Sequence, residues 1–283
     1  MRLDDFRESE NIEDRRGMGP VVAGGGLGIG GLIIVGLISL FLGVDPRALL
    51  QMAPGSSPAP QQQVAPGTPH DEAGRFVAKV LGQTEDTWSD ILRRQGVTYE
   101  KPRLVLFRGS TQSSCGFAQA QMGPFYCPND RKVYIDLSFF DELRSRFHAP
   151  GQFAQAYVIA HEIGHHVQNL VGILPKVHAR QQRSDKVEAN QLSVRLELQA
   201  DCLAGVWANR ANEAKQFIES GDVESAINAA TAIGDDRLQQ QSRGYVVPDA
   251  FTHGSSKQRV QWFMNGFRGG TLESCNTFAN RGA

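Results

Sequence analysis

Two histidines and a glutamate stand together in the run H-E-I-G-H at residues 161–165. His161 and His165 are four residues apart, so on a helix they share one face, with Cβ atoms about 5–6 Å apart. Two imidazoles at this spacing can bind one zinc ion. Glu162, about 100° further round the helix, can serve as general base for a water that the metal activates. The alternative is a solvated helix face, but apolar neighbours on both sides predict a buried helix, where unbound polar groups are costly.

A third ligand is predicted on another helix, in the run E-L-Q-A-D at residues 197–201. Glu197 is the expected metal ligand. Asp201, one turn later, is expected to accept a hydrogen bond from a ligand imidazole and so fix the tautomer of that ring. Ala200 and Ala204 are small enough for the two helices to approach closely. Three protein ligands with one open position are typical of catalytic zinc. A solvated charged face is the alternative, although apolar residues surround the pair.

Two more polar residues lie near the C-terminal end of the chain. His253 comes just before a predicted helix, and Arg259 follows six residues later. A zinc peptidase must stabilise the oxyanion of a tetrahedral intermediate, and His or Arg donors can do this. An ordinary histidine near a helix cap explains His253 equally well. Among the other histidines, His166 cannot share the face of His161, and three stand in polar or loop-like contexts: His70, His148 and His178.

The elements that must position these residues can be predicted from hydrophobic spacing and turn signals. Five helices are expected, over 75–95, 153–170, 187–207, 223–233 and from 256 onward. Their expected caps are Asp222 and Gly234 for the fourth helix, and a capping box of Ser255 and Gln258 for the fifth. Short strands are expected at 104–107 and 133–137. The expected fold class is therefore α+β, mostly helical, with a small sheet.

The chain divides into four segments: a polar tail at 1–20, an uncharged apolar stretch at 21–44, a Pro/Gln-rich linker at 45–74 and a folded domain at 75–283. A helix needs about 20 apolar residues to cross a bilayer, whereas a cleaved signal peptide has an apolar core of about 7–15. The stretch is therefore predicted as a single transmembrane helix. Arginines are concentrated before it, which predicts a cytoplasmic N-terminus and a periplasmic or extracellular domain of an inner-membrane protein.

The apolar stretch also contains a formal G-x-G-x-x-G pattern at residues 26–31. A dinucleotide site is rejected, because no strand precedes the pattern and it lies inside the apolar stretch. Glycines four residues apart let membrane helices pack closely, so a homo-oligomer formed through this stretch is one expectation. Simple tolerance of glycine in lipid is the other.

Bulk composition excludes some function classes. The 283 residues carry a net charge of −1, which argues against a nucleic-acid partner. A serine-hydrolase G-x-S-x-G elbow and a P-loop are both absent from the sequence.

The four cysteines form no C-x-x-C pair, so a cysteine-bound zinc is not expected. Outside the cytoplasm an even count suits two disulfides, for which three pairings exist. Cys115–Cys127 and Cys202–Cys275 are favoured, because the first two cysteines are close in sequence and bracketed by glycines and prolines. Four reduced, partly buried thiols are the alternative.

With these motifs placed, the chain resembles the neutral zinc metallopeptidases of bacteria, the YpfJ type. The resemblance spans nearly the whole chain. It includes the Met1-Arg2 start, R-R-G at 15–17, the apolar stretch, the linker, P-F-Y-C-P at 124–128, the run at 160–168 and E-L-Q-A-D-C at 197–202. The chain is also similar, more distantly, to gluzincin peptidases, which pair H-E-x-x-H with E-x-x-x-D. This implies a zincin-like domain.

Membrane-linked members of that clan carry a T-H-P…R element. Here the matching run is T-H-G at 252–254 followed by Arg259, with glycine where proline is usual. The resemblance implies that His253 and Arg259 assist the transition state. It also implies that an edge strand before the active-site helix receives the substrate backbone, and 133–137 is the expected strand.

The expected activity is hydrolysis of polypeptides by a membrane-anchored zinc metalloendopeptidase with one zinc ion per chain. A catalytically silent metal-binding adaptor is the rival class, and the intact Glu162 counts against it. A zinc amidase acting on cell-wall peptide is a third class, which the sequence does not separate from a protease.

Overall fold

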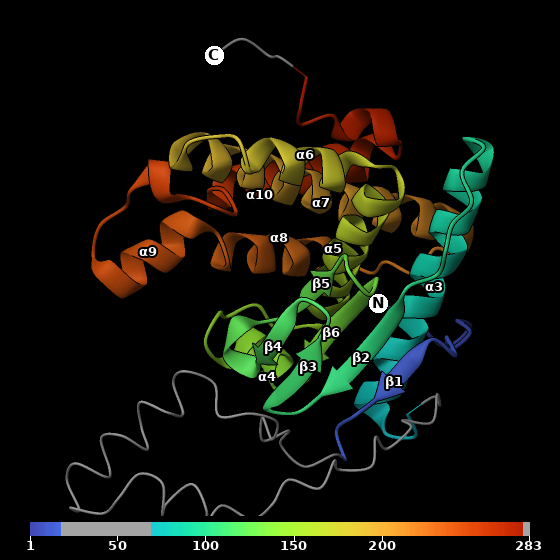
Figure 1. Ribbon diagram of the computed structural model, residues 1–283. Helices are drawn as coiled ribbons and strands as arrows, with labels where there is room; N and C mark the ends of the chain where they lie inside the picture. Colours follow the sequence, from blue (N-terminus) through green and yellow to red (C-terminus); the bar gives the residue numbers. More distant parts are fainter. Residues whose placement is uncertain (18–68, 280–283) are drawn as a thin grey trace, which may run out of the picture.

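The computed structural model describes residues 1–17 and 69–279. A four-stranded sheet lies on one side of the molecule, and most helices lie on the other (Figure 1). The sheet has the order β1-β2-β6-β5, formed by β1 (Ile12–Asp14), β2 (Arg103–Phe107), β6 (Lys132–Asp136) and β5 (Phe125–Cys127). Strands β1, β2 and β6 are parallel, and β5 is antiparallel to β6. A separate hairpin contains β3 (Ser110–Ser113) and β4 (Gly116–Gln119).

Eight α-helices occur in the part of the chain that the structure describes. They are α3 (Glu72–Arg94), α4 (Ser138–Ser145), α5 (Gln152–Leu170), α6 (Ile173–Gln181), α7 (Lys186–Lys215), α8 (Asp222–Ala232), α9 (Asp235–Arg243) and α10 (Ser256–Gly269). Short 3-10 helices are η1 (Ala120–Met122), η2 (Pro248–Ala250) and η3 (Leu272–Cys275). The predicted α+β class, mostly helical with a small sheet, is confirmed.

The five predicted helices and two predicted strands are all present, with shifted ends. The capping box of Ser255 and Gln258 at the start of α10 is confirmed. The caps predicted for α8 are wrong. Its N-cap is Gly221, so Asp222 is already the first helical residue. Its last turn ends at Ile233, and Gly234 instead caps the start of α9. Gly234 therefore lies at the start of α9, which follows α8 almost directly, and does not cap the end of α8.

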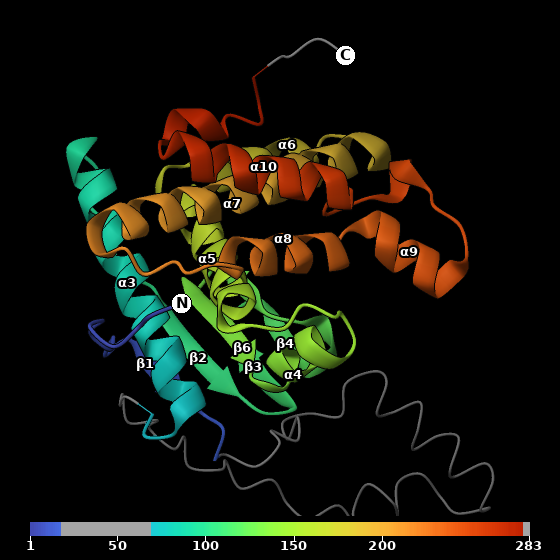
Figure 2. The same cartoon turned by 180° about the vertical axis from the view of Figure 1, so that it is seen from behind.

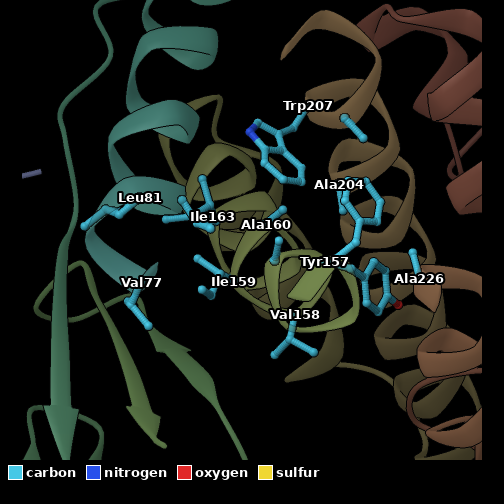
Figure 3. Close-up of a cluster of buried hydrophobic side chains, with 14 of the residues drawn as sticks. Val77, Leu81, Tyr157, Val158, Ile159, Ala160, Ile163, Ala204, Trp207 and Ala226 are labelled. Carbon is cyan, nitrogen blue, oxygen red and sulfur yellow. The ribbon is translucent and has the colours of Figure 1, made fainter. Parts of the chain in front are cut away.

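Helix α5 runs through the middle of the core (Figure 3). Its Ile159 and Ile163 lie toward Val77 and Leu81 of α3, and its opposite side meets α7 and α8. Successive side chains along β2 and β6 lie on opposite faces of the sheet, as expected for strands. Leu104, Leu106, Val133 and Ile135 join this core, whereas Val105, Phe107 and Tyr134 form a second cluster. Burial of α5 on several sides gives the histidine-bearing helix a fixed position.

Glycines allow the helices that carry the site to approach closely. A Cβ at Gly164 would lie 3.0 Å from the carbonyl oxygen of Ala200, so α5 and α7 are nearly in backbone contact there. Helix α10 packs along α7 in the same way (Figure 2), since a Cβ at Gly266 would lie 1.9 Å from the carbonyl oxygen of Cys202. Larger side chains at either glycine would separate the helices.

Residues 1–17 are part of the folded domain, contrary to their prediction as a separate tail. Strand β1 pairs in parallel with β2, with Ile12 opposite Leu104 and Asp14 opposite Leu106. Ile12 is fully buried and Phe6 is 7% exposed. The prediction failed because the segment contains few apolar residues, and many of its contacts are hydrogen bonds and ion pairs.

The predicted transmembrane helix at 21–44 and the predicted linker up to residue 68 lie outside the described residues. So do the glycines proposed to pair two such helices. Within the described ranges, no helix combines the length and the apolar character that a membrane crossing requires.

Both disulfides favoured in the sequence analysis are present in the structure. Cys115–Cys127 joins the β3–β4 hairpin to strand β5. Cys202–Cys275 joins α7 to η3. Cys202 directly follows Asp201, so the second disulfide fixes the C-terminal segment next to the candidate site.

Candidate metal centre

The three predicted metal ligands come together between α5 and α7. One ligand atom from each of His161, His165 and Glu197 lies within 4.8 Å of the other two. The Nε2 atom of His161 is 3.1 Å from one carboxylate oxygen of Glu197, and Nε2 of His165 is 3.4 Å from the other. Two imidazoles and one carboxylate form one of the donor sets that hold catalytic zinc. The described residues therefore fit a zinc ion.

Asp201 contacts the ring nitrogen of His161 that does not face Glu197, as predicted. Its Oδ1 accepts a hydrogen bond from Nδ1 of His161 at 2.8 Å, which leaves Nε2 free to face Glu197. Burial by itself would lower the pKa of His161, but the carboxylates of Asp201 and Glu197 raise it to about 10 in the metal-free chain. A metal must therefore displace a proton from this ring, and metal binding is expected to weaken as the pH falls.

Arg259 contacts Asp201 rather than projecting freely into the site. Its Nε and Nη2 atoms donate to the two oxygens of Asp201, each at 2.9 Å, and its Nη1 donates to the carbonyl of Ile233 at 3.3 Å. Tyr157 completes the cluster by donating its hydroxyl to Asp201 Oδ1 at 2.5 Å. Arg259 is 3% exposed and Asp201 is fully buried. These contacts support a positioning role for Arg259, through Asp201 and His161, while the role predicted for it in the transition state stays a prediction.

Replacing Arg259 should damage stability as well as activity. Arg259→Met removes one partner of a buried ion pair, which typically costs about 3–5 kcal/mol of unfolding free energy. Arg259→Lys should recover little, because an ammonium cannot bind both oxygens in the forked geometry. Urea unfolding measures the effect, with exposed Arg268→Met on the same helix as control. Unchanged stability with lost turnover would instead favour a direct role in the transition state.

Glu162 lies in the wall of the main cavity, next to the ligand histidines. It is 8% exposed, and its carboxyl group makes no hydrogen bond to another group among the described residues. Burial raises the pKa of Glu162 above its usual value. A carboxylate whose pKa is shifted toward neutrality is suited to accept and return a proton.

His253 lines the same cavity from the loop before α10. Asp235, at the start of α9, holds this loop. Its Oδ2 accepts backbone hydrogen bonds from Thr252, His253 and Gly254 at 2.7, 2.6 and 3.0 Å, and its Oδ1 lies 3.2 Å from Nδ1 of His253. The hydrogen bond to Asp235 raises the pKa of His253 above its usual value. His253 therefore projects from a loop that is anchored by one carboxylate.

This pair predicts a pH-dependent stability. Because the folded state raises the pKa of His253, the pair stabilises most below the ordinary histidine pKa of about 6.5, and the contribution fades as the pH rises through the folded value. The stability difference between wild type and Asp235→Asn should accordingly be larger at acidic than at alkaline pH. Thermal unfolding across a pH series measures it. A difference that stays constant with pH would contradict the pairing.

The cavity in front of the ligands has a volume of about 600 Å³. Aromatic side chains of Phe125, Phe139 and Phe147 line it together with the metal ligands. Strand β6 is internal, between β2 and β5, so the predicted substrate edge at 133–137 is wrong. The edge strand beside the cavity is β5.

His166 connects this edge strand to helix α5. It is fully buried, with Nδ1 3.0 Å from the hydroxyl of Tyr126 in β5 and Nε2 2.6 Å from the carbonyl of Glu100. Burial lowers the pKa of His166 to about 4, so the ring is neutral at physiological pH. Asn169 also donates to the Tyr126 hydroxyl, at 3.0 Å. Sequence reasoning correctly kept His166 from the metal, but missed this connection.

Comparisons with known proteins agree with the geometry. The family model described as "Putative neutral zinc metallopeptidase" matches residues 1–278. "Uncharacterized protein YpfJ" of Escherichia coli (strain K12) is 51% identical over 286 residues, which cover 98% of this chain and 99% of that protein. "Uncharacterized protein Rv2575" of Mycobacterium tuberculosis (strain ATCC 25618 / H37Rv) is 40% identical over 257 residues, 85% of each chain. No solved structure matches this chain significantly.

The family match covers the ligand residues on α5 and α7 and also the N-terminal strand β1. The resemblance seen in the sequence is thus confirmed over nearly the full length. From the family model and from the relative with half of its residues identical, the chain belongs to the neutral zinc metallopeptidase family.

Proposed function

We propose that the protein is a zinc metalloendopeptidase that hydrolyses peptide bonds in polypeptides. The observation that carries this proposal is the convergence of His161, His165 and Glu197, with Glu162 in the wall of the same cavity. Three ligands with an adjacent buried carboxylate suit catalytic rather than structural zinc. Zinc bound there, one ion per chain, would supply Lewis acidity and an activated water.

Other residues of the chain orient the metal ligands, transfer the proton and stabilise the oxyanion. Asp201 holds His161 in the tautomer whose Nε2 faces the metal position, and Tyr157 and Arg259 hold Asp201. Glu162 takes a proton from the attacking water and passes it to the leaving amine. His253, which lines the same cavity, donates a hydrogen bond to the oxyanion.

An extended peptide is the substrate that the cavity favours. The antiparallel edge strand β5 borders it and offers a backbone to which a peptide strand can be added. The phenylalanines that line the cavity favour an apolar side chain next to the scissile bond. A zinc amidase acting on cell-wall peptide would use the same chemistry. Cleavage of an unmodified linear peptide would separate the two activities.

We also propose that the domain works outside the cytoplasm and is attached to a membrane. Both disulfides suit an oxidising compartment, because cytoplasmic thiols are kept reduced. Attachment rests on the apolar sequence at 21–44, which is long enough to enter a bilayer.

The first test measures zinc content and cleavage of casein or a peptide library by the full-length protein. We expect about one zinc per chain, loss of cleavage on chelation, and recovery when zinc is added back. Zinc binding without cleavage of any peptide would favour the catalytically silent adaptor. A protein that binds no zinc would contradict both functions.

A further inference from the structure

Each ligand histidine has a different partner behind it. Asp201 serves His161, whereas the Nδ1 atom of His165 is 2.8 Å from Oε1 of Gln168. Gln168 lies one turn later on α5 and is fully buried. Gln168 ends the run at 160–168 that carries the family resemblance, but the sequence predicts no role for it. The acceptor next to His165 is thus a neutral amide rather than a carboxylate.

The backbone carbonyl of Leu196 fixes the orientation of the Gln168 amide. Nε2 of Gln168 lies 2.7 Å from the carbonyl oxygen of Leu196, which can only accept a hydrogen bond. The amide nitrogen must therefore face Leu196, and the amide oxygen must face His165. An oxygen at that position requires a hydrogen on Nδ1 of His165. The Nε2 lone pair is consequently left for the metal.

Gln199 also helps to fix the orientation of the Gln168 amide. Nε2 of Gln168 also donates to Oε1 of Gln199 at 3.0 Å. Nε2 of Gln199 donates in turn to the carbonyl of Cys275 at 3.0 Å, so its orientation is also fixed by an oxygen that can only accept. Cys275 is held to α7 by its disulfide with Cys202. A chain of directed hydrogen bonds thus runs from the disulfide-anchored segment to the metal ligand.

We propose that Gln168, held by Gln199, is a positioning residue that sets the tautomer and ring orientation of His165 for metal binding. The proposal rests on the metal site of the proposed function. Partners of this kind typically change metal affinity about 10–100-fold when they are removed. The effect reaches the metal only through His165, so it is separable from any contact with substrate.

The test compares three Gln→Met variants of the full-length protein, because methionine has a similar length and is a poor acceptor. Gln168→Met should raise the zinc dissociation constant about 10–100-fold, measured by competition with a chromophoric chelator. Gln199→Met should act in the same direction with a smaller effect. Gln83→Met is the matched control, since Gln83 is 5% exposed and bonds Trp207 and Thr87, away from the metal ligands.

Long-range ¹H–¹⁵N NMR of the zinc-loaded protein gives a second readout. We expect a hydrogen on Nδ1 of His165 that exchanges slowly in wild type and rapidly in Gln168→Met. Equal zinc affinity and equal exchange in a folded Gln168→Met protein would overturn the proposal. A wild type that binds no zinc would instead contradict the proposed function, so the two failures are distinguishable.

A second inference comes independently from residues 1–17. The carboxylate of Glu85 is fully buried, and it accepts from Arg7, Ser9 and Asn11 at 2.7, 2.6 and 2.7 Å. Lys101 is 3.6 Å away. Three of the four groups that compensate this buried charge therefore belong to the N-terminal segment. Without that segment the carboxylate would lose most of its partners, which is strongly unfavourable.

The pairing of β1 with β2 also indicates that the folded domain requires residues 1–17. Without β1, strand β2 would be an open edge, and the sites filled by Ile12 and Phe6 would be empty. We infer that residues 1–17 lie on the same side of the membrane as the domain. A single crossing between residues 17 and 69 would put β1 and β2 on opposite sides. Together with the exported domain proposed above, the inference places the N-terminus outside the cytoplasm, in place of the predicted cytoplasmic N-terminus.

Cysteine labelling in intact cells tests this inference. Glu10 and Lys257 are both exposed, one in the N-terminal segment and one on α10. Single Glu10→Cys and Lys257→Cys variants of the full chain should react alike with a membrane-impermeant maleimide, before and after lysis. Labelling of Lys257→Cys in intact cells and of Glu10→Cys only after lysis would overturn the inference. If both variants were labelled only after lysis, residues 1–17 and the domain would still lie on the same side of the membrane. That result would contradict an exported domain.

Discussion

Glu162→Gln is expected to keep zinc at the wild-type level and to lower the rate of peptide cleavage about 10²–10⁴-fold, the usual contribution of a general base. Glutamine has nearly the same shape as glutamate, so the cavity wall should be preserved. It cannot hold the proton of the attacking water. Because the carboxyl group of Glu162 makes no hydrogen bond to another described group, the substitution should not disturb the fold.

Glu142→Gln provides a matched control for this variant. Glu142 lines the same cavity, but it is on α4 and pairs with Arg146 rather than with a metal ligand. Its substitution should leave cleavage within a few-fold of wild type. Metal content by mass spectrometry and initial cleavage rates give both readouts. A Glu162→Gln enzyme with near wild-type turnover would remove Glu162 from the mechanism and require another base.

Deleting residues 1–68 should largely unfold the remaining domain. Phe6 and Ile12 each contribute about 1.5–3 kcal/mol by burial, and a buried carboxylate left without partners costs about 3–5 kcal/mol. Their sum is on the order of the whole stability of a typical domain, about 5–15 kcal/mol. Circular dichroism during thermal unfolding would show a lost or strongly lowered transition.

A shortened chain supplies the control. Arg16 contacts Asp71, so the two ends flanking residues 18–68 lie near each other. Residues 1–17 joined to 69–283 by a short Gly/Ser linker should therefore unfold at nearly the wild-type temperature. If 69–283 alone were equally stable, residues 1–17 would be dispensable, and the inference about their location would lose its energetic basis.

Short-range patterns gave most of the candidate site. His161, His165, Glu197 and Asp201 all lie on helices whose apolar periodicity is strong, and spacing on a helix determines which side chains share a face. The relative approach of α5 and α7 was also predictable, because Ala200 is small. The disulfide pairing followed from sequence proximity and local turn residues.

Long-range polar contacts could not be predicted in this way. Gln168 and Asp235 are common polar residues in ordinary helical contexts, and only the folded chain places them behind His165 and His253. The contact between Arg259 and Asp201 has the same origin, because sequence spacing does not show that one edge of this guanidinium group binds both oxygens of Asp201. Strand β1 has three residues, too short for an alternating pattern to be detected.

The pairing of β1 with β2 also has a consequence for the order of folding. Ile12 lies opposite Leu104, so the first strand to be synthesised must wait for a partner about ninety residues later. Contacts between residues so distant in sequence form slowly, because a long loop must close first. Until then both strand edges can pair with other chains. We therefore expect the full chain to refold in a late, rate-limiting step that becomes faster when residues 1–17 are joined to residue 69 by the short linker.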